Sequence, residues 1–203
     1  MTTGTLYIVS APSGAGKTSL VAALLKAEPR VFKSVSYTTR AARPGERNGR
    51  DYHFVGLERF TQMVADGEFL ETARVHENHY GTSRRWVDEH TALDHDIVLE
   101  IDWQGALQVR RLMTEAVGIF VMPPNFPALE ARLRGRGLDS ADVIERRLAA
   151  ARGEMAHFVD FDYVIINDDF DRAAQDLTSI IRSERLRIPR QHARHRELFD
   201  HLK

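Results

Sequence analysis

The chain of 203 residues is 43% hydrophobic and 28% charged, the balance of an ordinary soluble globular protein. It contains no cysteine, which excludes disulfides and cysteine-ligated metal sites. Its formal net charge of −1 gives no overall field favouring nucleic acid or a membrane surface, and its N-terminus lacks the pattern of a secretory signal. We therefore expect a cytoplasmic protein that binds neither nucleic acid nor membrane.

Strand-like and helix-like patterns alternate along most of the chain. Four apolar runs have the length of buried strands: residues 5–10, 96–102, 117–122 and 162–168. Each precedes a segment with apolar residues at helical spacing: residues 17–27, 104–113, 126–135 and 170–188. This alternation predicts an α/β fold of three layers (α/β/α), in which helices cover both faces of a parallel central sheet.

Two segments interrupt the alternation. Residues 34–90 contain short β-like pieces, a basic turn-rich loop and one helical run, which predicts a small mixed α/β insertion. Residues 125–158 are helical, rich in arginine and broken by the sequence RGRGLDS, which predicts a helical lid. We expect a single domain over 1–203, with a core made of 1–33, 91–124 and 159–203.

The sequence SAPSGAGKTSL at residues 10–20 joins the first predicted strand to the first predicted helix. Glycines let the backbone wrap so that successive amides face one point, where the helix N-terminus adds partial positive charge. This is the context of a phosphate-binding P-loop, in which the lysine reaches the β- and γ-phosphates and the threonine hydroxyl ligates Mg²⁺. The predicted ATP-binding residues are Ala11, Pro12, Ser13, Gly14, Ala15, Gly16, Lys17 and Thr18. The alternative is a glycine-rich turn without a ligand.

A second group of candidate binding residues lies in the insertion. Arg40 and Arg43 carry forked guanidinium groups that bind phosphate bidentately, and Tyr52 and Tyr80 can donate hydroxyls to the same anion. Glu71 stands among apolar neighbours, where a carboxylate can accept from both the N1–H and the amine of guanine. Adenine lacks that donor pair, so a buried acid favours guanine. Taken singly, each residue could equally be a solvated loop charge or a packing residue.

The chain resembles bacterial guanylate kinases. The resemblance rests on the stretches IVSAPSGAGKTSL, SVSYTTRAARPGE, DYHFV, FLE, HYGTS, IDWQGA, RLRGRG and INDDF, which extend from residue 4 to about 190. It implies the reaction ATP + GMP ⇌ ADP + GDP with Mg²⁺, and it identifies the insertion as the GMP-binding part. ATP and GMP are the implied small-molecule partners, with dGMP as an alternative acceptor.

The resemblance also assigns roles by position. It gives the GMP phosphate to Arg40, Arg43, Tyr52 and Tyr80, and the guanine base to Ser36, Glu71, Thr82 and Glu100. Family members commonly have aspartate at the last of these positions. In the lid it directs Arg136 and Arg147 toward the triphosphate, whereas Arg132 and Arg134 are expected to face solvent.

Two residues at predicted strand ends each have two interpretations. Asp102 can hold Mg²⁺ through water, which we favour, or can cap the helix that follows it. Asn167 can contact the adenine of ATP, or can belong to an ordinary strand-to-helix turn.

The implied chemistry needs no covalent nucleophile or general base, because the attacking group is an ionised phosphate oxygen of GMP. We expect catalysis to come from alignment and from the positive charge of Mg²⁺ and of Lys17, Arg43, Arg136 and Arg147.

Three other functions are compatible with parts of this sequence. They are phosphorylation of another nucleoside monophosphate, non-catalytic binding of phosphoproteins by a guanylate-kinase-like module, and switch-type ATP hydrolysis. Glu71 argues against the first, and the intact Gly16, Lys17 and Thr18 argue against the second. The sequence offers no recognisable residue to position an attacking water, which argues against the third.

Overall fold

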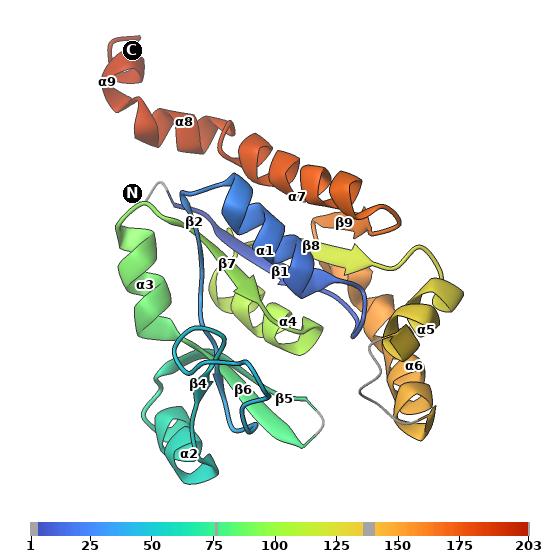
Figure 1. The fold of residues 1–203 in the computed structure, drawn as a ribbon. Coiled ribbons are helices and arrows are strands. Elements are labelled where there is room, and N and C mark those ends of the chain that lie inside the picture. The colour runs from blue at the N-terminus through green and yellow to red at the C-terminus, as the bar shows by residue number, and fades with distance from the viewer. Residues whose placement is uncertain (1–3, 76, 136–140, 203) are drawn as a thin grey trace.

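The computed structural model describes residues 4–75, 77–135 and 141–202, whose strands form two sheets (Figure 1). The larger sheet is parallel throughout. Its strand order is β2 (Val31–Lys33), β7 (Asp96–Glu100), β1 (Leu6–Ser10), β8 (Val117–Met122) and β9 (Tyr163–Ile166). Because β1 is central, the loop that follows it opens at the middle of the carboxyl edge of the sheet.

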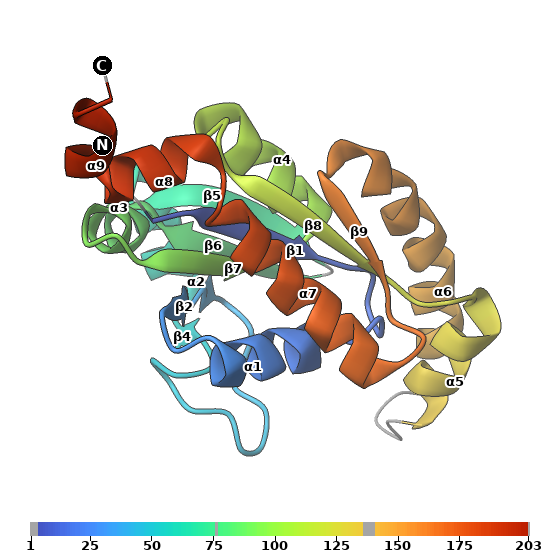
Figure 2. The ribbon, with the colours of Figure 1, turned by 90° about the horizontal axis from the view of Figure 1, so that it is seen from above.

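The larger sheet is apolar on both faces. In β1, Tyr7 and Val9 pack into one hydrophobic cluster while Leu6 and Ile8 pack into another, as the alternation of side chains along a strand requires. Helices α1 (Lys17–Ala27) and α7 (Phe170–Glu184) cover the first face and lie side by side (Figure 2). Helices α3 (Arg84–Ala92) and α4 (Trp103–Leu112) cover the second.

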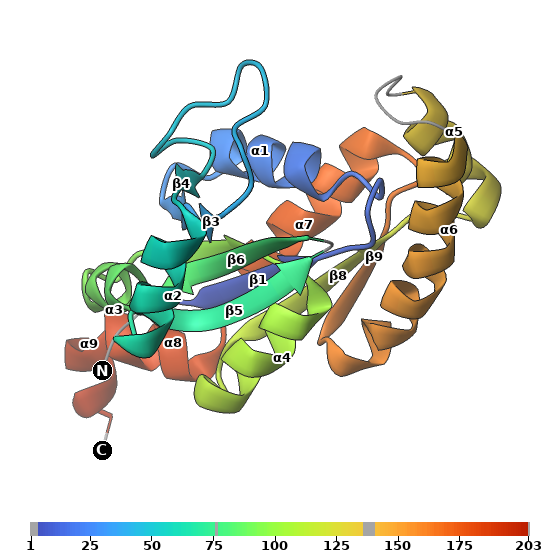
Figure 3. The same cartoon turned by 90° about the horizontal axis from the view of Figure 1, so that it is seen from below.

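The smaller sheet is mixed and has the order β4 (His53–Phe54), β3 (Tyr37–Thr38), β6 (Asn78–Ser83) and β5 (Phe69–Val75). Helix α2 (Leu57–Ala65) covers it through Phe60 and Met63, which pack with Phe69 (Figure 3). Helix α4 joins this sheet to the core. The side-chain amide of Gln108 donates to the carbonyl of Thr72 at 2.7 Å and accepts from its amide at 3.2 Å.

Two further helical pieces complete the chain. Helices α5 (Phe126–Gly135) and α6 (Ala141–Ala156) pack on each other through Leu129, Leu133, Ile144 and Ala151, and the short helix η1 (His157–Asp160) leads from α6 toward β9. Helices α8 (Ile188–Arg194) and α9 (Arg196–Asp200) extend beyond the end of α7 (Figure 1). No helix within the described ranges is both long enough and apolar enough to cross a membrane.

The α/β class and the parallel central sheet predicted from the sequence are confirmed. The apolar pattern does not predict β2, which has three residues, or β6, whose residues are mostly small or polar. It also does not predict α3, in which only Val87 is buried among the described side chains. The division of the chain into a core, an insertion of 34–90 and a lid of 125–158 stays a prediction.

Candidate functional site

A cleft of about 430 Å³ opens at the carboxyl edge of the larger sheet and brings together residues far apart in the sequence. The loop after β1 contributes Ala11, Pro12, Ser13, Gly14, Gly16, Lys17, Thr18 and Ser19. The smaller sheet and its loops contribute Ser36, Arg43, Tyr52, Glu71, Ala73, Arg74, Val75 and Tyr80. The β7–α4 junction contributes Glu100, Ile101, Asp102 and Gln104, and α6 contributes Arg147, Ala150 and Glu154. The predicted phosphate loop thus shares one cleft with most of the predicted GMP residues.

The loop after β1 has the backbone of an anion-binding turn. Gly14 and Gly16 adopt left-handed conformations, with φ of 92° and 97°. A Cβ at position 16 would lie 2.4 Å from Nδ2 of Asn167, so a side chain here would displace the amide of Asn167. Helix α1 begins at Lys17, which places the positive end of its dipole at the cleft. Nζ of Lys17 donates to the carbonyl of Ile101 at 3.2 Å.

Two side chains support this loop from outside the cleft. Asn167 is 4% exposed and donates to the carbonyl of Ala15 at 2.7 Å. Arg132 of α5 donates to the carbonyl of Asn167 at 2.7 Å and to that of Ala15 at 3.5 Å. The prediction that Arg132 faces solvent is wrong, because its helix packs beside the loop. Arg134 is exposed and pairs with Glu130.

Glu100 ends β7 and Asp102 follows two residues later, and the two acids contact different groups. Glu100 accepts from the Thr18 hydroxyl and, at 2.7 Å, from Nζ of Lys33. Burial tends to raise the pKa of Glu100, but the charges of Lys17 and Lys33 outweigh it and hold the pKa below its ordinary value, so the carboxylate is ionised. Asp102 caps α4, since its Oδ1 accepts from the amide of Gly105 at 2.9 Å. The capping interpretation of Asp102 is therefore confirmed, and its metal role stays a prediction.

A buried carboxylate lies beside the start of α4. Glu71 is 3% exposed and accepts from the hydroxyl of Thr82 at 2.7 Å. Burial raises the pKa of Glu71 from 4.5 to about 7, and the nearby charge of Asp102 adds to the rise. A Cβ at Gly105 would lie 2.5 Å from Oε2 of Glu71, so the first turn of α4 touches this carboxylate. Glu71 and Thr82 are thus hydrogen-bonded to each other, and Ser36, Glu71 and Asp102 line the same cleft.

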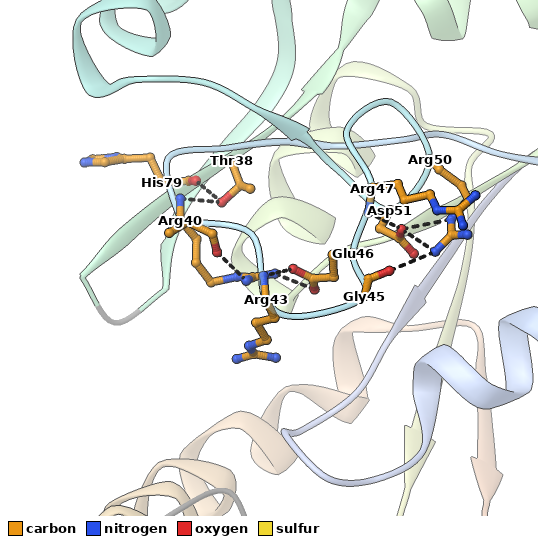
Figure 4. A network of polar contacts seen from close by, with 10 residues as sticks. Thr38, Arg40, Arg43, Gly45, Glu46, Arg47, Arg50, Asp51 and His79 are labelled. Carbon is orange, nitrogen blue, oxygen red and sulfur yellow. Dashed lines mark hydrogen bonds and ion pairs between the residues drawn. The ribbon is translucent and has the colours of Figure 1, made fainter.

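The basic loop after β3 is ordered through Glu46 (Figure 4). The Arg40 guanidinium pairs with Oε1 of Glu46 at 2.8 Å and lies over the ring of Tyr52, 5.3 Å from its centroid. Oε2 of Glu46 accepts from the backbone amide of Arg43 at 2.7 Å, and Figure 4 shows the Arg43 guanidinium directed away from Glu46. Burial, and then the charge of Glu100, raise the pKa of Tyr52 to about 12, so its hydroxyl remains a hydrogen-bond donor.

Helix α6 presents Arg147, Ala150 and Glu154 to the cleft. These positions are three, four and seven residues apart and so share one helical face. Oε2 of Glu154 accepts from the amide of Ser13 at 3.3 Å, which puts a carboxylate against the phosphate loop. Arg136, the other lid arginine singled out in the sequence, lies outside the described residues.

Four of the predicted site residues that the structure describes do not line the cleft. Ala15, Arg40, Thr82 and Asn167 are described but are not among its lining residues; Ala15, Thr82 and Asn167 are buried. Conversely, eight residues that line the cleft are not predicted from the sequence: Ser19, Ala73, Arg74, Val75, Ile101, Gln104, Ala150 and Glu154. Glu154 could have been found from its spacing of two helical turns after Arg147. Arg74 offers no comparable signal, because it pairs with the exposed Glu77 at a hairpin end.

Comparison with known proteins identifies relatives over nearly the whole chain. Residues 3–184 match the family model described as guanylate kinase. A guanylate kinase of Aromatoleum aromaticum is 57% identical over 199 residues, which cover 98% of each chain. A guanylate kinase of Thiobacillus denitrificans is 60% identical over 196 residues, which cover 97% of this chain and 94% of the relative. A crystal structure of guanylate kinase from Anaplasma phagocytophilum has a TM-score of 0.79 at 34% identity and covers 93% of this chain and 90% of its own.

Proposed function

Because the chain belongs to the guanylate kinase family, and so phosphorylates GMP to GDP with ATP, we propose that the two nucleotides meet in this cleft with their phosphates facing. One observation carries the proposal. Lys17 and Thr18 of the phosphate loop line the same 430 Å³ cleft as Arg43, Tyr52 and Glu71 of the smaller sheet.

The ATP phosphates occupy the loop after β1. The amides at the start of α1 and of the glycine turn donate to the β-phosphate, and Lys17 exchanges its bond to the Ile101 carbonyl for phosphate oxygens. Asn167 keeps the Ala15 carbonyl turned away from the anion, because its amide is bonded there. It therefore acts on ATP through the shape of the loop rather than by touching adenine.

The GMP phosphate is held by the arginine and tyrosine side chains of the insertion. Arg43, Tyr52 and Tyr80 line the same cleft. Arg40 is the second guanidinium and is positioned by Glu46 and by the ring of Tyr52. Glu46 thus orders both arginines before an anion arrives.

The guanine base is read by Glu71 with Thr82 and Ser36. The local geometry favours exchanging the roles that the sequence suggests for two acids. Asp102 is near enough to Glu71 to raise its pKa, which favours a place for Asp102 beside the base. Glu100 accepts from the hydroxyl of Thr18, which favours a place for Glu100 beside the metal.

The residues at that corner fit a magnesium ion that arrives with ATP. Thr18 and Glu100 offer hard oxygen donors, which is the ligand chemistry that Mg²⁺ prefers. Among the residues that the structure describes, no cluster of three or more histidine or acidic side chains could form an all-protein cage, so the phosphates would complete the coordination. When bound, the metal neutralises charge on the phosphates.

Catalysis then rests on alignment and on positive charge. Arg43 holds the attacking phosphate in line, and Lys17 and Arg147 stabilise charge on the transferred group, as the sequence also suggests for Arg136. Helix α6 carries Arg147 over the cleft and so also helps to exclude water during transfer.

Calorimetry with ADP and three monophosphates tests the proposal. The wild type should bind ADP together with GMP, and its affinity should fall in the order GMP, IMP, AMP, because IMP lacks the amine and AMP offers neither donor. Glu71→Gln should lose most of this discrimination while keeping its affinity for ADP. Equal affinities of the wild type for the three monophosphates would contradict the role of Glu71, and mutual exclusion of ADP and GMP would contradict the two-nucleotide cleft.

A further inference from the structure

Lys33 lies outside the phosphate loop and the basic loop, yet it reaches the proposed metal corner. It is the last residue of the edge strand β2, and its register partner Val98 lies two residues before Glu100 on the neighbouring strand β7. From there its Nζ lies 2.7 Å from Oε2 of Glu100. The exposed fractions of the two side chains are 27% for Lys33 and 9% for Glu100, so water screens the pair only in part.

Glu100 is held at both of its oxygens. Lys33 binds Oε2, and the hydroxyl of Thr18 donates to Oε1. The two contacts fix the direction of the carboxylate before any ligand is present. The Lys33 contact also places a positive charge directly on the carboxylate, in the same cleft that Lys17 lines.

We propose that Lys33 is a positioning residue for the nucleotide-bound metal. Its ammonium aims Glu100 at Thr18, and as a resident cation it weakens the attraction of that carboxylate for a free divalent cation. The corner therefore accepts a metal ion together with nucleotide phosphates, whose negative charge offsets the two lysines. This inference rests on the proposed function, in which Thr18 and Glu100 lie beside Mg²⁺.

Binding of Mn²⁺, followed by electron paramagnetic resonance with and without ADP, tests the inference. Removing a unit charge so close to the carboxylate should raise the affinity of Lys33→Met for Mn²⁺ without ADP by about tenfold. Lys33→Gln should do the same, which guards against an effect of the methionine itself. Lys33→Arg keeps the charge and should stay within about twofold of the wild type. Lys26→Met, which removes an exposed lysine at the end of α1, is the matched control and should change nothing.

The outcomes distinguish the role of Lys33 from the proposed placement of Glu100 beside the metal. Unchanged or weaker Mn²⁺ binding in both neutral variants would overturn the role of Lys33. Glu100→Gln should weaken Mn²⁺ binding in the ADP complex. If it does not, the placement of Glu100 beside the metal is wrong, whatever the lysine variants show.

Discussion

We propose that the two ends of the cleft hold phosphate in different ways. At the proposed ATP end the donors are main-chain amides, in a loop shaped by Gly14 and Gly16 and supported by the buried Asn167. At the proposed GMP end the donors are side chains, carried by an exposed loop in which Arg40 is paired with Glu46. Phosphate binding at the first end depends on the backbone conformation of the fold, and at the second end it depends on individual side chains.

This difference determines what a substitution can do. An amide cannot be removed by changing its side chain, so the ATP end is sensitive to backbone shape and to the one cation that projects from it. The GMP end can be altered one guanidinium or one carboxylate at a time, and each loss should appear in the kinetics of GMP alone.

Lys17→Ala tests the end made of main-chain amides. It should lower kcat about a thousandfold, since it removes a cation aimed at the transferred group, while leaving GMP affinity unchanged. A coupled ADP-release assay gives kcat, and calorimetry gives the affinity for GMP. A kcat within tenfold of the wild type would mean that the main-chain amides support phosphoryl transfer without the charge of Lys17.

Arg43→Ala tests the end made of side chains. It should lower kcat/KM for GMP about a hundredfold, because a charge-assisted bond to phosphate is lost, and should leave the KM for ATP nearly unchanged. Arg47→Ala is the matched control. Arg47 is exposed in the same loop but is not among the described residues that line the cleft, so its removal should cost little. Equal losses of kcat/KM in the two variants would mean that the loop acts through its overall positive charge, without a defined contact between Arg43 and the phosphate.

The pH dependence of GMP binding sharpens the comparison. Burial raises the pKa of Glu71 to about 7, and only the ionised form offers an acceptor oxygen to each of the two guanine donors. GMP affinity should therefore fall by up to about tenfold per pH unit below pH 7 and level off above it. The phosphate of GMP titrates in the same range, so the profile is compared with that of Glu71→Gln, in which only the phosphate contribution remains. Parallel profiles would contradict the role of Glu71.

The stability of the ligand-free protein gives an independent check of the same titration. The folded state holds a proton on Glu71 between the ordinary value of 4.5 and about 7, whereas the unfolded state does not. Stability should therefore fall as the pH rises through this window, by about 3 kcal/mol in total for this group. Glu71→Gln should lack this fall, so its melting temperature relative to the wild type should be higher at pH 8 than at pH 4.5.

Asn167→Ala gives the smallest expected effect. It leaves the Ala15 carbonyl without its side-chain amide donor, which should cost about 1–2 kcal/mol and lower the melting temperature by about 3–6 °C. The KM for ATP should rise by a few-fold while the KM for GMP stays constant. A larger change in the KM for GMP would show that the two ends are not independent.

The sequence predicts the parts of this molecule that depend on local pattern. Gly14, Gly16 and Lys17 are recognisable because a strand, a glycine turn and a helix follow one another within a short stretch. The parallel sheet follows from the alternation of apolar runs with helical segments.

Contacts across the fold are not predictable in this way. Arg132 reads as a surface charge on its own helix and becomes a support of the loop only when α5 packs beside it. Lys33 and Glu100 are separated by 67 residues, and only the pairing of β2 with β7 brings them together. Neither contact can be predicted from residue spacing or composition.

The two hydrogen bonds between the Gln108 side chain and the Thr72 backbone tie the smaller sheet to helix α4. Thr72 adjoins Glu71, and the missing side chain of Gly105 lets that acid rest on the first turn of α4, where Asp102 is the cap. The acid that we propose reads the purine is therefore fixed to the core helix, although its strand belongs to the smaller sheet. On the proposed function, the base binds to a part of the site that is anchored to the core, and adjustment to the GMP phosphate is left to the loop that carries Arg40 and Arg43.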